Sequence, residues 1–351
     1  MIAGRGPKLE GSLGLVKLCI YIMIRNIDAH SFGIFCKESG GSQAGVVDFN
    51  QSLRTNKNND DKIVVDMWAN TKRISDRKMH SRLQFDRIGN WSEIKLEILK
   101  KYADAYSTIL SAQTKTTFFH VYIDAFAGAG QHISRETDEI VPGSPLNALN
   151  VRPPFREYHL IEIAPEKIEN LKELIGPRND VFIHEGDCNS ILLSDVFPRV
   201  QYTEYRRGLC LLDPYGLHLD WEVLSTAGHM KSLDVFLNFP VQDMNRNVFW
   251  HNPNDVDEVD VRRMNRYWGN ESWRNVVYET KRNLFGWLEK EPNEVIAEAF
   301  RQRLKDVAGF DRVPEPLPMK NSKGAIVYYL FFASQNETAA KIARQIFAKY
   351  R

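Results

Sequence analysis

Residues 118–130 read FFHVYIDAFAGAG, and the fold that the sequence predicts is organised around this stretch. A run so dense in aromatic and β-branched residues predicts a buried central strand. The strand ends at Asp124, and glycines directly after a buried strand allow a tight turn and a close approach of a ligand to the main chain. We therefore expect Asp124, Phe126, Gly128 and Gly130 to contact a nucleotide-type ligand, although similar turns also occur where nothing binds.

The glycine turn lacks two parts of the dinucleotide-binding fingerprint. That fingerprint requires a third glycine and an acidic residue about 20 positions further on, and neither is present. An acidic residue ahead of a G-x-G turn is similar instead to the first motif of the S-adenosylmethionine methyltransferases. That similarity implies S-adenosylmethionine as the cofactor.

The overall composition is that of an ordinary globular protein. The 351 residues exceed a typical single core, so we expect one large α/β domain with additions. A net charge of +1 argues against a strongly basic nucleic-acid binder, although it allows a local basic patch. Cys19, Cys36, Cys188 and Cys210 show no C-x-x-C pair and no metal-ligand spacing, so we expect no metal site and a reducing cytoplasm.

Residues 1–85 differ in composition from the rest of the chain. The apolar run at 13–24 is too short to span a bilayer, so no membrane segment is expected. Residues 40–42 and 56–61 have loop or linker composition. A basic cluster at 72–87 could hold phosphates or form a solvated helix face. We expect residues 1–85 to form a weakly ordered, poorly defined extension.

Two helices are predicted around the first strand. Apolar residues recur at helical spacing over residues 94–110, with Ser92 as the N-cap and Lys95 facing water. After a polar loop at 131–140, Ser144 followed by proline predicts the N-cap of a second helix. The N–H groups at its start would favour a carboxylate near the glycine turn, or the helix is simply capped.

Acidic residues follow the next two predicted strands. Glu162, close to the end of the strand at 158–163, can accept both ribose hydroxyls, or it is an ordinary exposed strand-end glutamate. Asp187 follows the strand that begins at Val181, and its carboxylate can reach an adenine amino group. It can also cap the following helix, or do both.

The fourth predicted strand, 209–212, leads into the sequence DPYG at 213–216. Proline fixes this turn and glycine frees it, so Asp213 and Tyr215 are held at a strand tip. A buried strand has no packing reason to end in an exposed aspartate and an aromatic. We expect Asp213 and Tyr215 to be catalytic, and Pro214, Tyr215 and Gly216 to contact the substrate.

A fifth strand at 232–240 completes a doubly wound α/β sheet of the Rossmann type within residues 86–240. Residues 241–309 are predicted to be a helical insertion. Residues 310–351 are predicted to return to the sheet as an antiparallel hairpin, formed by 313–318 and 325–332, and a last helix. A terminal hairpin after five parallel strands is similar to the closing feature of class I methyltransferase sheets.

Taken together, residues 91–351 resemble the three-Cys-motif partner proteins (TcmP), a bacterial family with a methyltransferase-like Rossmann fold. The matching features are the helix at 95–106, the turn at 124–130, PGSPL at 142–146, LDPYG at 212–216, WGNESW at 268–273 and YYLFFAS at 328–334. The family turn usually has proline where Ala129 stands. The resemblance implies a separate partner of the iron–sulfur or radical type, which bears the three-cysteine motif.

Three functions, in order of preference, follow from these patterns and resemblances. The DPYG turn is also similar to the fourth motif of tRNA guanine-N2 methyltransferases and, more loosely, of adenine-N6 methyltransferases. The first hypothesis is therefore an S-adenosylmethionine-dependent methyltransferase for an amino group of a nucleobase in RNA or DNA. In it Asp213 holds the amine and Tyr215 stacks on the base. The alternative is a non-catalytic Rossmann subunit that binds the three-cysteine partner, and a nicotinamide oxidoreductase comes third.

Overall fold

The computed structural model describes residues 85–282 and 288–351 of the chain. The extension predicted for residues 1–85 lies outside these residues apart from Phe85, and so do Cys19 and Cys36. Among the described residues, no helix is long and apolar enough to cross a membrane.

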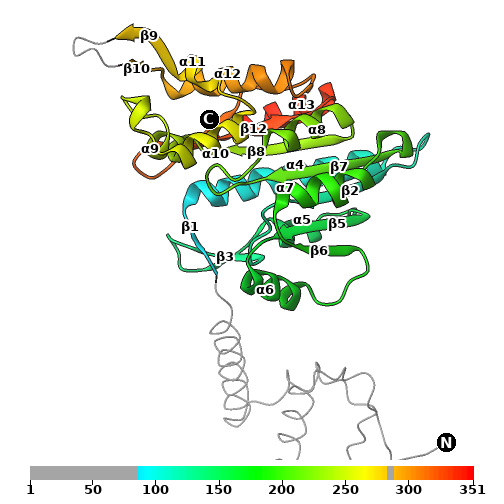
Figure 1. Ribbon diagram of the computed structural model, residues 1–351. Coiled ribbons are helices and arrows are strands. Elements are labelled where there is room, and N and C mark those ends of the chain that lie inside the picture. Colours follow the sequence, from blue (N-terminus) through cyan, green and yellow to red (C-terminus); the bar gives the residue numbers. More distant parts are fainter. Residues whose placement is uncertain (1–84, 283–287) are drawn as a thin grey trace, which may run out of the picture. The chain divides into compact units, whose positions relative to one another are not determined.

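A seven-stranded sheet lies at the centre of the described part, in the order β11-β12-β8-β7-β2-β5-β6 (Figure 1). Its strands are β2 (Phe119–Asp124), β5 (Glu157–Glu162), β6 (Val181–Glu185), β7 (Arg206–Leu212), β8 (Leu233–Phe239), β11 (Leu317–Lys320) and β12 (Ile326–Ala333). The strands from β8 to β6 are parallel, while β12 runs antiparallel to both β8 and β11. This is the predicted fold: an α/β Rossmann-like sheet with a terminal antiparallel hairpin.

Side chains alternate between two hydrophobic cores, one on each face of the sheet, because successive residues of a strand point in opposite directions. In β2, Val121 and Ile123 belong to one core and Tyr122 to the other. In β8, Leu237 belongs to the same core as Val121, and Phe236 belongs to the same core as Tyr122. Both faces of the parallel strands are therefore buried, which is why these strands are nearly continuous apolar runs in the sequence.

Helices cover both faces of the sheet. The face of Tyr122 is covered by α4 (Asn90–Ser111), α5 (Ser144–Leu149), α6 (Pro165–Ile175) and α13 (Glu337–Phe347). The other face is covered by α7 (Cys188–Ile191), η2 (Leu192–Val196), η3 (Phe197–Arg199), α8 (Trp221–Met230), α9 (Val241–Asn247), α10 (Glu258–Trp268), α11 (Trp273–Val277) and α12 (Asn293–Asp306). Two short 3-10 turns, η4 (Tyr202–Glu204) and η5 (Pro253–Asp255), lie in the connections.

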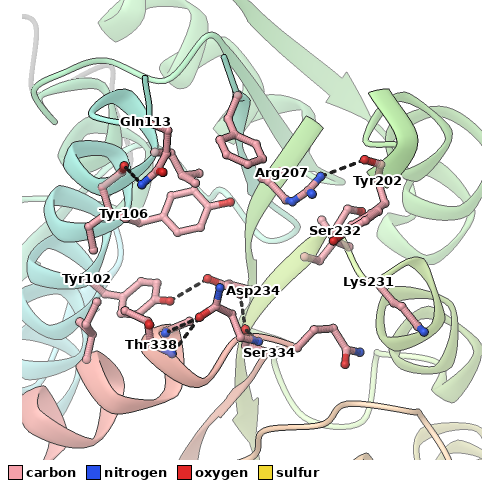
Figure 2. Close-up of a pocket in the computed structure, with 18 residues that line it drawn as sticks. Tyr102, Tyr106, Gln113, Tyr202, Arg207, Lys231, Ser232, Asp234, Ser334 and Thr338 are labelled. Atoms are coloured by element: carbon pink, nitrogen blue, oxygen red, sulfur yellow. Dashed lines mark hydrogen bonds between the residues drawn. The ribbon is translucent and has the colours of Figure 1, made fainter. Parts of the chain in front are cut away.

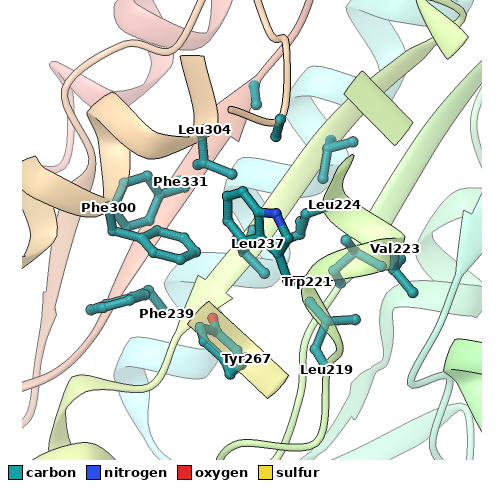
Figure 3. Packing of buried hydrophobic residues seen from close by; sticks show 14 of the residues in the cluster. Leu219, Trp221, Val223, Leu224, Leu237, Phe239, Tyr267, Phe300, Leu304 and Phe331 are labelled. Carbon is teal, nitrogen blue, oxygen red and sulfur yellow. The ribbon is translucent and has the colours of Figure 1, made fainter. Parts of the chain in front are cut away.

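The core on the second face joins the residues after β8 to the main sheet. Figure 3 shows Phe300 of α12 among Tyr267 of α10, Phe239 of β8 and Phe331 of β12, with Trp221 of α8 beside them. All five side chains are at most 9% exposed. The helices between β8 and β11 therefore pack directly on the sheet.

The predicted helix starts are wrong by three residues in one case and by one residue in the other. Helix α4 begins at Asn90, its N-cap is Gly89, and no side chain caps it, so Ser92 is not the N-cap. In α5, Gly143 is the N-cap and Ser144 is already helical. Glycine is an accepted N-cap; here it replaces the serine that the pattern favoured.

Two small sheets were not predicted. The loop expected at 131–140 contains β3 (Gln131–Ser134), which pairs with β1 (Arg87–Ile88) and with β4 (Ile140–Pro142). Strands β9 (Tyr278–Arg282) and β10 (Leu288–Lys290) pair within the segment predicted to be helical. The first hairpin strand expected at 313–318 lies further on, at β11, since Pro314 and Pro316 leave two positions of the earlier run without a backbone donor.

Candidate functional site

A cavity of about 260 Å³ opens at the carboxyl ends of β2, β7 and β8. The predicted site residues that line it are Phe126, Gly128, Asp213, Pro214, Tyr215 and Gly216. The other predicted residues, Asp124, Gly130, Glu162 and Asp187, do not line this cavity. The structure thus brings the glycine turn and the DPYG turn together and places the remaining four residues below or beside them.

The two glycines of the first turn have different surroundings. Gly128 has a φ of +64°, and a Cβ built there would meet no atom within 4 Å, so the space above it is open. Gly130 has a φ of +83°, and a Cβ there would lie 2.9 Å from Cδ1 of Leu171 in α6. Gly128 therefore offers room for a ligand, whereas Gly130 is needed for the turn and its packing.

Asp124 supports the turn from beneath and has no exposed surface. Its carboxylate accepts hydrogen bonds from the N–H of Phe126 at 3.3 Å and the hydroxyl of Tyr122 at 3.2 Å. The hydroxyl of Ser144 is a third donor. Burial raises the pKa of Asp124 to about 6, in spite of these donors. The residue ties the end of β2 to the start of α5.

Glu162 and Asp187 continue the row of acidic groups along the edge of the sheet, because β7, β2, β5 and β6 are consecutive neighbours. Glu162 accepts from the N–H of Gly128 at 2.8 Å and from two N–H groups that follow it at 2.9 and 3.0 Å. Asp187 caps α7 through the N–H of Ser190. Burial alone would raise the pKa of Asp187, but hydrogen bonds from Ser190 and Asn189 lower it.

Lys95 is the most informative residue that sequence reasoning missed. It was expected to face water, yet it is only 8% exposed, and its ammonium pairs with Oδ2 of Asp213. It also lies 5.5 Å from the centre of the Tyr328 ring. The start of α4 lies against the end of β7, so the long side chain reaches the strand tip rather than solvent.

Asn238, at the end of β8, holds the other oxygen of Asp213. Its Nδ2 donates to Oδ1 of Asp213 at 2.9 Å. A carboxylate only accepts hydrogen bonds, so this contact fixes the amide orientation and turns Oδ1 of Asn238 away. That Oδ1 is buried and has no donor among the described residues, although Asn238 lines the cavity. The site therefore contains an unsatisfied acceptor next to a carboxylate.

The rim of the cavity carries an exposed aromatic ring. Tyr215 is 70% exposed, and the ammonium of Lys167 lies 5.7 Å from the centre of its ring. Lys167 in turn forms an ion pair with Asp86 at 2.7 Å. A free aromatic face next to a fixed cation is the type of surface on which a planar group stacks.

His132 on β3 is a further lining residue that the sequence did not indicate. Burial, and then the charge of Lys95, lower its pKa, so the ring is neutral at neutral pH. Its Nδ1 is buried and has no partner among the described residues. The only sequence signal was its position two residues after the glycine turn, in a stretch predicted to be a loop.

Comparisons with known proteins find similarity at the level of structure only. No model of a known protein family matches this sequence, and no curated protein sequence matches it. The resemblance to the three-Cys-motif partner proteins therefore stays a prediction.

Several solved structures have a similar fold. A protein from Legionella pneumophila, of family-model DUF519, is 13% identical over 75% of this chain and 93% of its own, with a TM-score of 0.42. A "putative S-adenosylmethionine dependent methyltransferase" from Listeria monocytogenes is 10% identical over 68% of this chain and 99% of its own, with a TM-score of 0.35. The CurJ carbon methyltransferase is 11% identical over 68% of this chain and 54% of its own, with a TM-score of 0.34. At such low sequence identities, the similarity concerns the fold alone.

The described residues contain no group of three or more His, Cys, Asp or Glu side chains that could hold a metal ion. Cys188 and Cys210 are free and buried. Burial raises the pKa of the Cys188 thiol to about 12 and raises that of Cys210 further, so neither is a reactive thiolate at neutral pH.

Proposed function

We propose that this chain is an S-adenosylmethionine-dependent methyltransferase whose acceptor is an exocyclic amino group of a nucleobase in RNA or DNA. The observation that carries the proposal is the pair of acceptors at the ends of β7 and β8. Asp213 and Asn238 both line one cavity, and the buried Oδ1 of Asn238 has no donor among the described residues, so a primary amine that enters between them could donate one N–H to each side chain.

The residues along the sheet edge fit the cofactor. The open space above Gly128 allows a ligand to lie against the main chain. Glu162 and Asp187 follow on the neighbouring strands, although Glu162 already accepts three backbone N–H groups and would use its remaining lone pairs for a ribose. S-adenosylmethionine would supply an electrophilic methyl group on its sulfonium sulfur.

Asp213 and Asn238 would position the acceptor amine. With both N–H bonds directed to fixed acceptors, the nitrogen lone pair would point away from them and be free to attack the methyl group that the cofactor supplies. The N–C bond would form as the C–S bond breaks, with the electron pair of the broken bond left on sulfur. The extra proton on nitrogen can leave along the hydrogen bond to Asp213. Lys95 shares Oδ2 of Asp213 and keeps the carboxylate in place for this exchange.

Tyr215 would hold the base. Its ring is exposed at the mouth of the cavity, next to Lys167, which could also contact a phosphate. Stacking on an aromatic ring is worth about 1–3 kcal/mol per base and does not depend on the base's identity. A target within a duplex would have to be flipped out to reach Asp213.

The first test is cofactor binding by isothermal titration. We expect micromolar affinity for S-adenosylmethionine or S-adenosylhomocysteine, about −8 kcal/mol. Gly128→Val should abolish it by filling the open space. Gly176→Val is the matched control, since Gly176 also has a positive φ of +68° and open space but lies at the end of α6. Binding of NAD in place of both sulfur ligands would contradict the proposal.

The second test is transfer of a labelled methyl group to total RNA and total DNA, with and without a three-cysteine-motif partner. Asp213→Asn and Asn238→Leu should each lower the rate about a hundredfold, or about 3 kcal/mol. Lys101→Met, on the exposed face of α4, should not change it. A wild type that binds a three-cysteine partner but labels neither acceptor would favour the non-catalytic alternative.

A further inference from the structure

A second cavity, of about 400 Å³, lies at the amino-terminal ends of the strands, opposite to the cavity described above. The starts of β7 and β8 form its floor, and α4 and α13 form one wall (Figure 2). Its volume is within the range typical of small-molecule sites. None of its lining residues belongs to the cavity described above, so it is not accounted for by the proposed methyl transfer.

A rigidly held guanidinium faces this cavity from the start of β7. Arg207 lies 3.8 Å from the centre of the Tyr202 ring and 5.1 Å from that of Phe118. Its Nη1 donates to the carbonyls of Tyr202 and Arg206 at 3.1 and 2.7 Å. Its Nε and Nη2 donate to no described residue. The group is thus pre-positioned, with donors left over for an anion.

A half-buried carboxylate lies on the floor of the same cavity. Asp234 accepts hydrogen bonds from the hydroxyl of Tyr102 at 2.7 Å and from that of Ser334 at 2.5 Å. Each of its oxygens can accept one more. Asp234 and Arg207 influence each other electrostatically, yet they form no ion pair in the described structure. Opposite charges that both reach one cavity without meeting leave room for a molecule between them.

The wall formed by α4 and α13 carries apolar residues that suit a side chain. Ile109, Leu110 and Ile342 line it, and Figure 2 shows the ring of Tyr106 extending toward Arg207. The hydroxyl of Tyr106 makes no hydrogen bond to any described residue, so it is available to a ligand. Two opposite charges on neighbouring strands, beside an apolar wall, match a zwitterion that carries an apolar side chain.

We propose that this second cavity binds a free α-amino acid with an apolar side chain. Arg207 pairs with its carboxylate, Asp234 pairs with its ammonium, and the aliphatic wall receives the side chain. The site is independent of the methyltransferase proposal, because β7 and β8 carry its residues at their starts and the other site's residues at their ends.

Isothermal titration of the full-length wild type with each of the twenty common α-amino acids tests this inference. We expect at least one apolar member to bind with a Kd below about 1 mM. Its decarboxylated amine and its deaminated acid should each bind about 10- to 100-fold more weakly, because one charge on the protein then stays unpaired. The inference is overturned if no amino acid binds, or if either one-charge analogue binds equally well.

Substitutions then locate the site. Arg207→Met keeps the stem between the two rings. Asp234→Asn keeps a partner for both hydroxyls of Tyr102 and Ser334, because its Oδ1 accepts from one and its Nδ2 donates to the other. Each substitution should weaken binding of the amino acid about 10- to 100-fold. Arg262→Gln, an exposed arginine of α10 outside the cavity, is the charge-matched control and should not change binding. Unchanged binding by a folded Arg207→Met variant would overturn the assignment. If a variant does not fold, the comparison of one-charge analogues on the wild type decides whether the inference holds.

Discussion

The carboxylate of Asp124 ends the strand that carries the glycine turn, and water does not reach it. Burial raises its pKa to about 6, while donation from Ser144 and Phe126 opposes the shift and the charge of Asp213 adds to it. At neutral pH the folded protein therefore holds a buried charge. The hydrogen bonds that this charge accepts fix the turn, at a cost to stability.

Replacing Asp124 by asparagine should change how stability depends on pH. The pKa of Asp124 in the folded protein, about 6, exceeds the usual aspartate value of 3.8. Asp124 therefore contributes stability below about pH 4, and this contribution is lost as the pH rises through 6. Two pKa units correspond to about 3 kcal/mol. The difference in unfolding free energy, wild type minus Asp124→Asn, should thus fall by about that amount between pH 3.5 and 7. Urea titrations at several pH values measure it, and a constant difference would contradict the assignment.

The residues that could be predicted at this scale are those with a local signature. Asp213 and Tyr215 stand in a proline–glycine turn after an apolar run, and both line the cavity, as their placement at a strand tip suggested. Lys95 lies 118 positions from Asp213, and Asn238 lies 25 positions from it. Nothing near either residue signals those contacts, because the fold and not the local sequence creates them.

Strands were predicted better than helix ends or short sheets. A strand buried on both faces is a continuous apolar run, and that run is visible without knowledge of its neighbours. Strands β1 and β9, by contrast, are held by pairing and are polar or mixed in sequence. Helix starts depend on backbone conformation, and Gly89 and Gly143 take the N-cap positions without a polar side chain.

A glycine within α8 provides a test of how closely these elements pack. A Cβ at Gly228 would lie 1.9 Å from the carbonyl oxygen of Ala308, just after α12. Gly→Ala inside a helix normally stabilises by about 0.5–1 kcal/mol. Here the clash with backbone should reverse the sign, and Gly228→Ala should destabilise by at least about 1–3 kcal/mol. Urea unfolding monitored by circular dichroism measures the change.

The control for that test is Glu222→Ala, on the exposed face of the same helix. It should shift the unfolding free energy by no more than about 1 kcal/mol. A stabilised Gly228→Ala would mean that α8 and the turn after α12 can separate without cost.

At the scale of the whole described part, the segment between β8 and β11 shares one hydrophobic core with the sheet. Trp268 of α10 and Phe300 of α12 belong to the same buried cluster as Val121 of β2 and Phe331 of β12. Arg303 of α12 adds a polar link, since its Nε donates to the carbonyl of Trp268 at 2.7 Å. A segment that depends on the sheet for its core has no basis for independent folding.

Phe300 connects the elements of that core and is fully buried. Its ring centre lies 4.6 Å from that of Phe239, 5.3 Å from Trp268 and 5.6 Å from Phe331. Phe300→Ala should therefore destabilise by about 3–5 kcal/mol, while Val295→Ala on the exposed side of α12 should change stability by less than about 1 kcal/mol. In both variants, urea transitions followed by circular dichroism and by tryptophan fluorescence should coincide, because the sheet and the segment lose one common core. If fluorescence changed first in Phe300→Ala while the circular dichroism signal persisted, the segment would be a separate folding unit, and its contacts with β8 and β12 would contribute little to its stability.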